Sequence, residues 1–166
     1  MASTQRPTEG FRREHEHLIH HLDDLRRTLD ALRDGLGERE VAGLREAAWF
    51  FQVALKPHAL WEERELYPLA DELIRRYGKP SATMEMDHRD LVARMDAFQR
   101  ELERLESGRA AAEDIDRIRI LGYQIEAILL LHFRKEEDVY LDAIDRHAAA
   151  DQVESLMESA REAHAH

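Results

Sequence analysis

The feature that most constrains this chain is an internal repeat of apolar residues at helical spacing. Residues 11–32 carry apolar side chains at steps of three, four and seven, which marks one face of an amphipathic helix. A shift of 73 residues places each of these positions on an apolar residue within 84–105. A shift of 74 aligns residues 55–66 with 129–140 in the same way. The sequence therefore predicts two related helical hairpins.

The composition favours long helices joined by short turns. Only 7 Gly and 4 Pro occur in 166 residues, and residues 34–38, 77–83 and 106–111 are the main interruptions. No segment alternates apolar and polar residues as a strand would. We therefore expect an all-α, up-down-up-down four-helix bundle with a short C-terminal fifth helix. The expected divisions are a flexible N-terminus over 1–8, the bundle over 9–147 and a C-terminal helix packed on it over 148–166.

Several local details follow from turn and capping chemistry. Ser81 is the expected N-cap of the third helix, and Asp151 with Glu154 forms a capping-box pattern at the start of the tail. Pro57 and Pro68 lie inside the second helix, where each removes a backbone donor and favours a bend. In the fourth helix, Val139 belongs to the predicted apolar stripe.

The repeat selects among ten histidines. His15 aligns with His88, and His58 aligns with His132, each on an apolar stripe. His17 and His20 have no histidine partner in the repeat and are assigned to a solvated face, and His21 borders the stripe. The remaining histidines, at or beyond the end of the fourth helix, have no evident partners: His147, His164 and His166.

In each hairpin, a carboxylate lies one helical turn after the second of the two selected histidines. Glu62 and Glu136 therefore share a helix face with His58 and His132, so each carboxylate could span two metal ions. The predicted ligand set is His15, His58, Glu62, His88, His132 and Glu136. Imidazole and carboxylate without sulfur suit iron, with Mn or Zn as less favoured ions. Without metal, each of these six buried polar groups would cost about 1–3 kcal/mol if left unsatisfied. The alternative to a metal site is therefore a hydrogen-bond network that pairs them with one another.

Other polar residues are expected beside this set. Glu63 and Glu137 directly follow the proposed carboxylate ligands and are expected to face solvent or support the ligands. Three helical tyrosines are further candidates to lie beside the ligands: Tyr67, Tyr123 and Tyr140.

Charge and cysteine content exclude several classes of function. The formal net charge of −11 argues against binding to nucleic acid or to an anionic membrane surface. The absence of cysteine excludes disulfides, thiolate metal sites and thiol nucleophiles. Without a membrane-length apolar run or a signal peptide, the expectation is a soluble cytoplasmic protein, as a monomer or small homo-oligomer.

The order H … HxxxEE … H … HxxxEE, with "HALWEERELYP" and "HFRKEEDVYL", resembles the hemerythrin-like, or HHE cation-binding, domain family. The resemblance covers about residues 9–147 and implies a four-helix bundle with a non-haem di-iron centre. It assigns the ligand role to the same six residues. The oxygen-carrying members have a fifth histidine one turn from the third-helix ligand, but here Met84 and Val92 flank His88. They also have the last carboxylate at plus five, where Glu137 stands here, after Glu136 at plus four.

Several functions remain open. The first is a di-iron protein that binds or senses O2, NO, peroxide or iron and redox state. The second is an enzyme with catalase-like peroxide decomposition or NO reduction. A ferritin-like oxidase is a third reading, because Glu14–His17 and Glu85–His88 have Glu-x-x-His spacing. A metal-free helical interaction module is the fourth.

Overall fold

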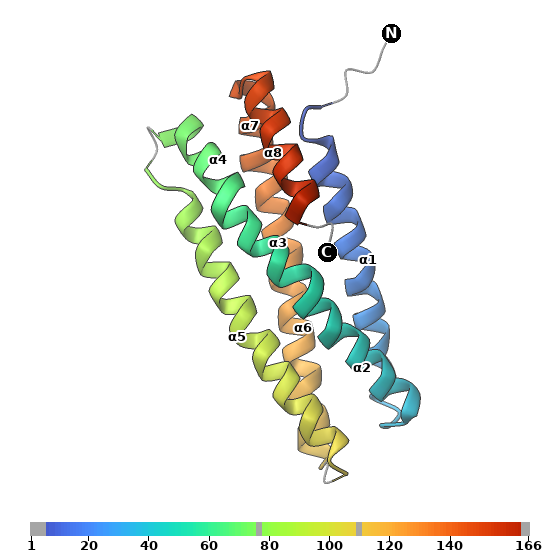
Figure 1. Cartoon of the computed structure of the whole chain (residues 1–166). Helices are drawn as coiled ribbons and strands as arrows, with labels where there is room; N and C mark the ends of the chain where they lie inside the picture. Colours follow the sequence, from blue (N-terminus) through green and yellow to red (C-terminus); the bar gives the residue numbers. More distant parts are fainter. Residues whose placement is uncertain (1–5, 76–77, 109–110, 164–166) are drawn as a thin grey trace.

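A computed structural model describes residues 6–75, 78–108 and 111–163, and the described chain is all-helical (Figure 1). The α-helices are α1 (Glu9–Ala31), α2 (Glu38–Phe50), α3 (Lys56–Trp61), α4 (Tyr67–Ile74), α5 (Ser81–Glu106), α6 (Ala112–Lys135), α7 (Asp142–His147) and α8 (Ala150–Ala163). Three π-helical segments connect some of them: η1 (Phe51–Leu55), η2 (Glu62–Leu66) and η4 (Glu136–Leu141). Within these described ranges, no helix combines the length and apolarity needed to cross a membrane.

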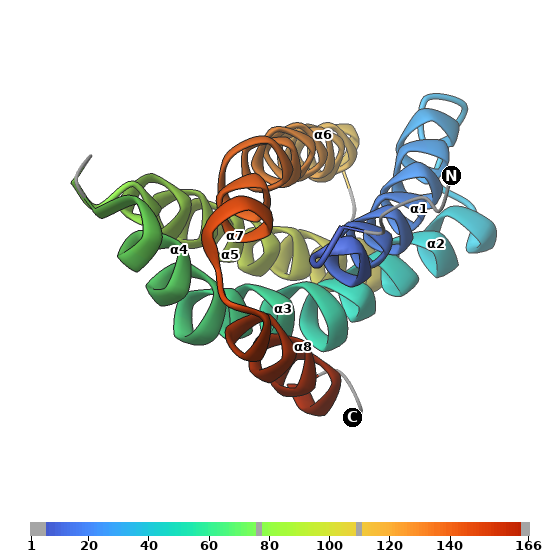
Figure 2. The same ribbon diagram turned by 90° about the horizontal axis from the view of Figure 1, so that it is seen from above.

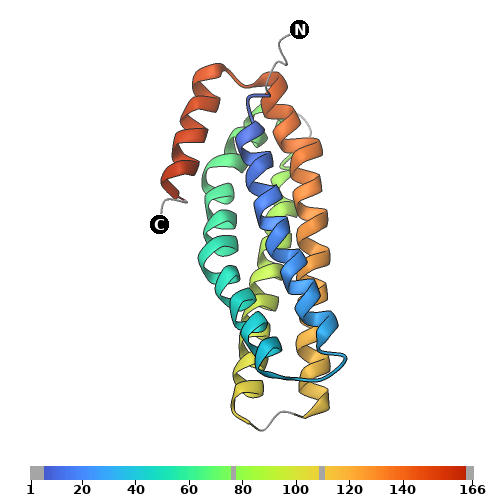
Figure 3. The same cartoon turned by 90° about the vertical axis from the view of Figure 1, so that its right-hand side faces the viewer.

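The π-helical segments join the shorter helices into continuous rods. The rod α2–η1–α3–η2–α4 follows α1, and the rod α6–η4–α7 follows α5. Figures 1 and 3 show α1, the two rods and α5 side by side with alternating direction. This is the predicted up-down-up-down bundle, and the all-α prediction is confirmed.

The repeated apolar stripes form the core of the bundle. All stripe positions of the first and third predicted helices are buried: Phe11, Leu18, Leu22, Leu25, Leu29, Leu32, Met84, Leu91, Met95, Phe98, Leu102 and Leu105. They fall into two apolar clusters, one containing Leu18 and Leu55 and the other containing Phe11 and Leu66. A buried polar layer, which includes His15, lies between these clusters along the bundle.

The π-helical segments η2 and η4 begin at equivalent positions of the repeat, Glu62 and Glu136. A π turn holds an additional residue and rotates the residues that follow it relative to an α-helix. The prediction that Val139 joins the core is therefore wrong: it is exposed, while Tyr140 and Leu141 are buried. Pro68 follows Glu62 only in the first hairpin, so a proline is not required for this turn.

Two predicted helix starts differ from the structure. Pro80 takes the cap position of α5, and Ser81 is the first helical residue, whose hydroxyl donates to Asp71 at 2.5 Å. The Ser81 side chain is thus used for a tertiary contact rather than for capping. At α8, the helix begins one residue before Asp151, and the Gln152 amide oxygen accepts from the Ala149 N–H at 2.9 Å.

The proposed domain limits, including the flexible segment 1–8, remain predictions, and residues 1–5 and 164–166 lie outside the described ranges. At the end of that segment, Thr8 is buried, and its N–H and hydroxyl donate to the Asp145 carboxylate at 2.8 and 2.9 Å. These bonds attach the start of α1 to α7.

The helix α8 folds back along the outside of α3 (Figure 2). The indole ring of Trp61, at the end of α3, contacts both α1 and α8. It stacks on Phe11 of α1 at a centroid distance of 5.1 Å and donates to the hydroxyl of Ser159 on α8 at 2.9 Å. Trp61 is buried, whereas Trp49 is 65% exposed on α2. The C-terminal helix thus covers the bundle beside Glu62.

Candidate metal centre

The structure brings all six sequence-predicted ligands into one buried cluster. His15 comes from α1, His58 from α3, Glu62 from η2, His88 from α5, His132 from α6 and Glu136 from η4. Each has a relative exposure of 4% or less. All four helical rods therefore contribute to one polar site inside the apolar core. Whether these six residues bind metal ions remains a prediction.

The four imidazoles form two pairs, one from each hairpin, which lie at opposite ends of the cluster. The first end consists of His15 and His58, and the second end consists of His88 and His132. The ring nitrogens Nε2 of His88 and His132 lie 2.9 Å apart. Among the described residues, two groups have geometry that could hold an ion: His15, His58, Glu62 and Glu136 form one, and Glu62, His88 and His132 form the other.

Each buried carboxylate faces both ends. Glu62 Oε1 lies 2.7 Å from His58 Nε2, while its Oε2 lies 3.2 Å from His88 Nε2. Glu136 Oε2 lies 3.5 Å from His15 Nε2, and its Oε1 lies 3.6 Å from His132 Nε2. This geometry is suited to carboxylates that bridge two cations.

Three carboxylate oxygens in the cluster fit a positively charged group. Glu62 Oε1, Glu62 Oε2 and Glu136 Oε2 are buried, and among the described residues no donor is aligned to hydrogen-bond them, although imidazole nitrogens lie 2.7–3.5 Å away. A buried acceptor without a donor costs about 1–3 kcal/mol, and more when charged. Cations between the carboxylates and imidazoles would compensate this cost. The donor set of nitrogen and oxygen atoms therefore fits a pair of metal ions.

Tyr67 is the buried tyrosine of the cluster. Its hydroxyl donates to Glu136 Oε1 at 2.6 Å and lies 3.3 Å from Nε2 of both His88 and His132. Burial raises the pKa of Tyr67, so the phenol keeps its proton. Of the other candidates, Tyr140 donates to the Pro80 carbonyl, and the Tyr123 hydroxyl bonds Asp30 away from the cluster.

Burial and the neighbouring charges shift the pKa values of both carboxylates and of several imidazoles in the cluster. Burial lowers the pKa of His132, but the charge of Glu136 and hydrogen bonds outweigh it and raise the pKa to about 9. The pKa of His58 is likewise raised, against burial, by Glu62. Burial raises the pKa of Glu62, but the charge of His58 reverses this and holds it well below its usual range. The pKa of Glu136 is raised by burial and by the charge of Glu62.

Carboxylates outside the cluster contact the outward nitrogens of the imidazoles. Glu63 and Glu137, expected beside the ligands, contact His88 and His15. Glu14 and Asp87 contact the other two imidazoles and were missed as site residues. The sequence contains a signal for this pair, because Glu14 and Asp87 are both acidic and align with each other in the 73-residue repeat.

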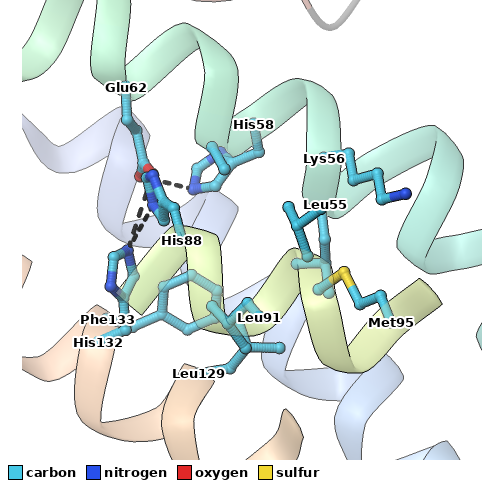
Figure 4. Close-up of a pocket in the computed structure, with 12 residues that line it drawn as sticks. Leu55, Lys56, His58, Glu62, His88, Leu91, Met95, Leu129, His132 and Phe133 are labelled. Carbon is cyan, nitrogen blue, oxygen red and sulfur yellow. Dashed lines mark hydrogen bonds and ion pairs between the residues drawn. The ribbon is translucent and has the colours of Figure 1, made fainter. Parts of the chain in front are cut away.

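A small cavity reaches the second end between α3, α5 and α6 (Figure 4). Its polar end is formed by His58, Glu62, His88 and His132, and its apolar lining includes Leu55, Leu91, Val92, Met95, Leu129 and Phe133. Its volume of about 20 Å³ holds one water-sized molecule. Val92, one of the two residues that flank His88 one turn away, contributes only an apolar surface here.

The histidines outside the selected set lie away from the cluster where the structure describes them. His17, His20, His21 and His147 are exposed. The ring of His21 stacks on Phe50 at 4.4 Å. His164 and His166 lie outside the described residues.

Comparison with known proteins agrees with this geometry. A family model described as the hemerythrin HHE cation-binding domain matches residues 6–144. This range contains all six clustered residues. No curated protein and no solved structure matched the chain.

Proposed function

The chain belongs to the hemerythrin HHE cation-binding family, and from this premise we propose that it holds a non-haem di-iron centre that binds or senses a small molecule such as O2, NO or peroxide. The observation that carries the proposal is the buried cluster itself. Four Nε2 atoms converge on two carboxylates, three of whose oxygens have no aligned hydrogen-bond donor among the described residues. A cation pair is the simplest group that satisfies all of them.

The choice of iron rests on donor chemistry. Imidazole and carboxylate donors without sulfur suit Fe, and Mn and Zn are the less favoured alternatives. Six side chains shared between two ions, with both carboxylates bridging, give about four protein contacts to each ion. An ion that prefers six ligands would therefore keep positions for water or a small molecule.

The cavity supports a small, uncharged or weakly polar ligand. Apart from the clustered residues, its lining is almost entirely apolar, and Lys56 is neutralised by Asp96, with Nζ and Oδ1 at 2.8 Å. The cavity volume of about 20 Å³ suits a ligand close to water in size. We propose that the exchangeable ligand binds at the second end, where this cavity meets His88 and His132.

The second candidate is an enzyme that consumes peroxide or NO, and Tyr67 favours it. A bound iron pair would supply redox chemistry at the site. The Tyr67 hydroxyl, held 2.6 Å from Glu136, is a hydrogen-bond donor beside that carboxylate and the second-end imidazoles, where it could stabilise a bound oxygen species. The ferritin-like oxidase has less support, because His17 is exposed and Glu14 contacts the outer nitrogen of His58.

Metal analysis of purified protein, with an absorption spectrum, tests the proposal. We expect two iron ions per chain in the native protein, and loss of bound iron in His132→Ala. The matched control is His17→Ala, which alters an exposed histidine and should keep both ions. A metal-free native protein, or iron lost equally in both variants, would contradict the di-iron centre.

Oxygen release on addition of peroxide separates the two candidates. Sustained release by the iron-loaded protein indicates an enzyme. Spectral changes without turnover indicate a binding or sensing protein.

A further inference from the structure

Four carboxylates at the edge of the cluster each contact the outward nitrogen, Nδ1, of one clustered imidazole. The Nδ1–oxygen distances are 3.0 Å for His58 with Glu14, 2.8 Å for His88 with Glu63, 3.2 Å for His132 with Asp87 and 3.2 Å for His15 with Glu137. The carboxylate side chains are between 26% and 36% exposed, whereas the imidazoles are buried. Each carboxylate thus lies between an imidazole and the solvent.

The four contacts form a closed ring around the bundle. Glu14 on α1 contacts α3, and Glu63 on η2 contacts α5. Asp87 on α5 contacts α6, and Glu137 on η4 contacts α1, which completes the circuit. Every rod therefore donates one carboxylate to the next rod and receives one from the previous rod.

The ring follows the sequence repeat. Glu14 and Asp87 directly precede His15 and His88, and Glu63 and Glu137 directly follow Glu62 and Glu136. A residue adjacent to a clustered one points about 100° away around the helix, toward the neighbouring rod. The ring is thus a second symmetric set of side chains, built on the same four rods.

The chemistry of these contacts fixes the proton on each imidazole. An ionised carboxylate only accepts hydrogen bonds, so Nδ1 must donate. This holds both for the neutral ring and for the charged ring, since Nδ1 carries a proton in either form. The inward nitrogen, Nε2, is then the one available to a cation. Carboxylate partners of this kind orient metal-bound histidines and increase their basicity.

We propose that Glu14, Glu63, Asp87 and Glu137 are a ring of positioning residues that fixes the tautomer and orientation of all four imidazoles and so preassembles the centre before ions bind. The metal-binding part of this inference rests on the proposed function. The orientation part concerns the protein's own hydrogen bonds. The two parts can be tested separately.

Glu63 is the best position for the test, because its side chain is the most exposed of the four and its replacement should leave the fold intact. Glu63→Ala should weaken metal binding by about 10–100-fold, measured by competition between full-length protein and a chelator for Zn²⁺. Glu63→Gln should restore most of the affinity, because its amide oxygen can accept the same hydrogen bond. The control is Glu65→Ala, which removes a neighbouring carboxylate that pairs with exposed Arg64.

Nitrogen-15 NMR of the imidazoles supplies a readout that does not require metal. In the native protein and in Glu63→Gln, the His88 Nδ1–H signal should be protected from exchange with water. In Glu63→Ala this protection should disappear for His88 and persist for His15. Glu137→Ala should show the opposite pattern.

Unchanged affinity and unchanged Nδ1–H protection in Glu63→Ala would overturn the ring. Loss of affinity that Glu63→Gln does not restore would also overturn it, since that outcome shows a requirement for charge rather than for orientation. If the native protein bound no ion pair, the di-iron proposal would fail, while the NMR comparison would still decide the inference on orientation.

Discussion

The two ends of the cluster have the same pair of imidazoles but different surroundings. At the second end, Tyr67 lies 3.3 Å from both Nε2 atoms, whereas its equivalent in the repeat is Leu141. The cavity is lined by both second-end imidazoles, but of the first end it reaches only His58. The six clustered residues therefore follow the repeat, while the phenol and the cavity depart from it. We expect ligand exchange to occur at the second end.

The largest effect should come from replacing Glu62, one of the two carboxylates that face both ends. Because Glu62 faces His58 with one oxygen and His88 with the other, Glu62→Ala should weaken binding of both ions by more than about 100-fold. Metal content after dialysis measures this, with Glu65→Ala as the control. Retention of one tightly bound ion would show that the ends are independent, contrary to the bridging geometry.

Removal of the ions should affect stability at both ends together. Ions present at about 1,000 times their dissociation constant stabilise the fold by about 4 kcal/mol. For a chain of this size, chelation should then lower the Tm by roughly 8–16 °C. Calorimetry with and without chelator measures the shift. Equal melting temperatures would imply that the unpaired oxygens of Glu62 and Glu136 are tolerated without cations.

A pH titration of chelator-treated protein should reveal the contribution of His132 to stability. The pKa of His132, at the second end, is raised from 6.5 to about 9 in the folded state. Its stabilising contribution is therefore complete below pH 6.5 and is lost as pH rises through about 9. The loss is on the order of 3 kcal/mol at most.

Chemical denaturation across this pH range measures the change. His132→Gln should reduce the pH dependence, because the pKa values of His58 and His15 stay raised, whereas His17→Gln should preserve it in full. A native protein whose stability did not fall as pH rose through this window would contradict the assignment to His132.

The smallest effect should come from Tyr67→Phe, because the hydroxyl that is lost lies beside the imidazoles of the second end only. It leaves Glu136 Oε1 without its hydrogen bond, and a hydrogen bond to a charged group is worth about 1.5–3 kcal/mol. We expect both ions to remain and the affinity for an added ligand such as azide to change by roughly 10–100-fold. Azide titration followed by absorption measures this. Tyr140→Phe, which removes a hydroxyl bonded to a backbone carbonyl, should have no effect.

The sequence predicted the fold and the six clustered residues because both depend on periodic spacing. His15 and His88 were identifiable since they share a stripe and a repeat position. The outward residues Glu14 and Asp87 were missed because a carboxylate beside a stripe is common on solvated helices, and only tertiary packing shows which imidazole it meets. The prediction for Val139 was wrong because the π turn at Glu136 changes the helical register, and apolar periodicity does not indicate such a turn.

The packing of α8 on Trp61 has a consequence for spectroscopy. The chain has 2 tryptophans, and only Trp61 is buried next to a clustered carboxylate, whereas Trp49 faces water. Their emission should differ in wavelength, with the shielded indole to the blue. A paramagnetic ion near Glu62 would quench that blue component selectively. The intrinsic fluorescence of the protein would then report the metal occupancy of the cluster.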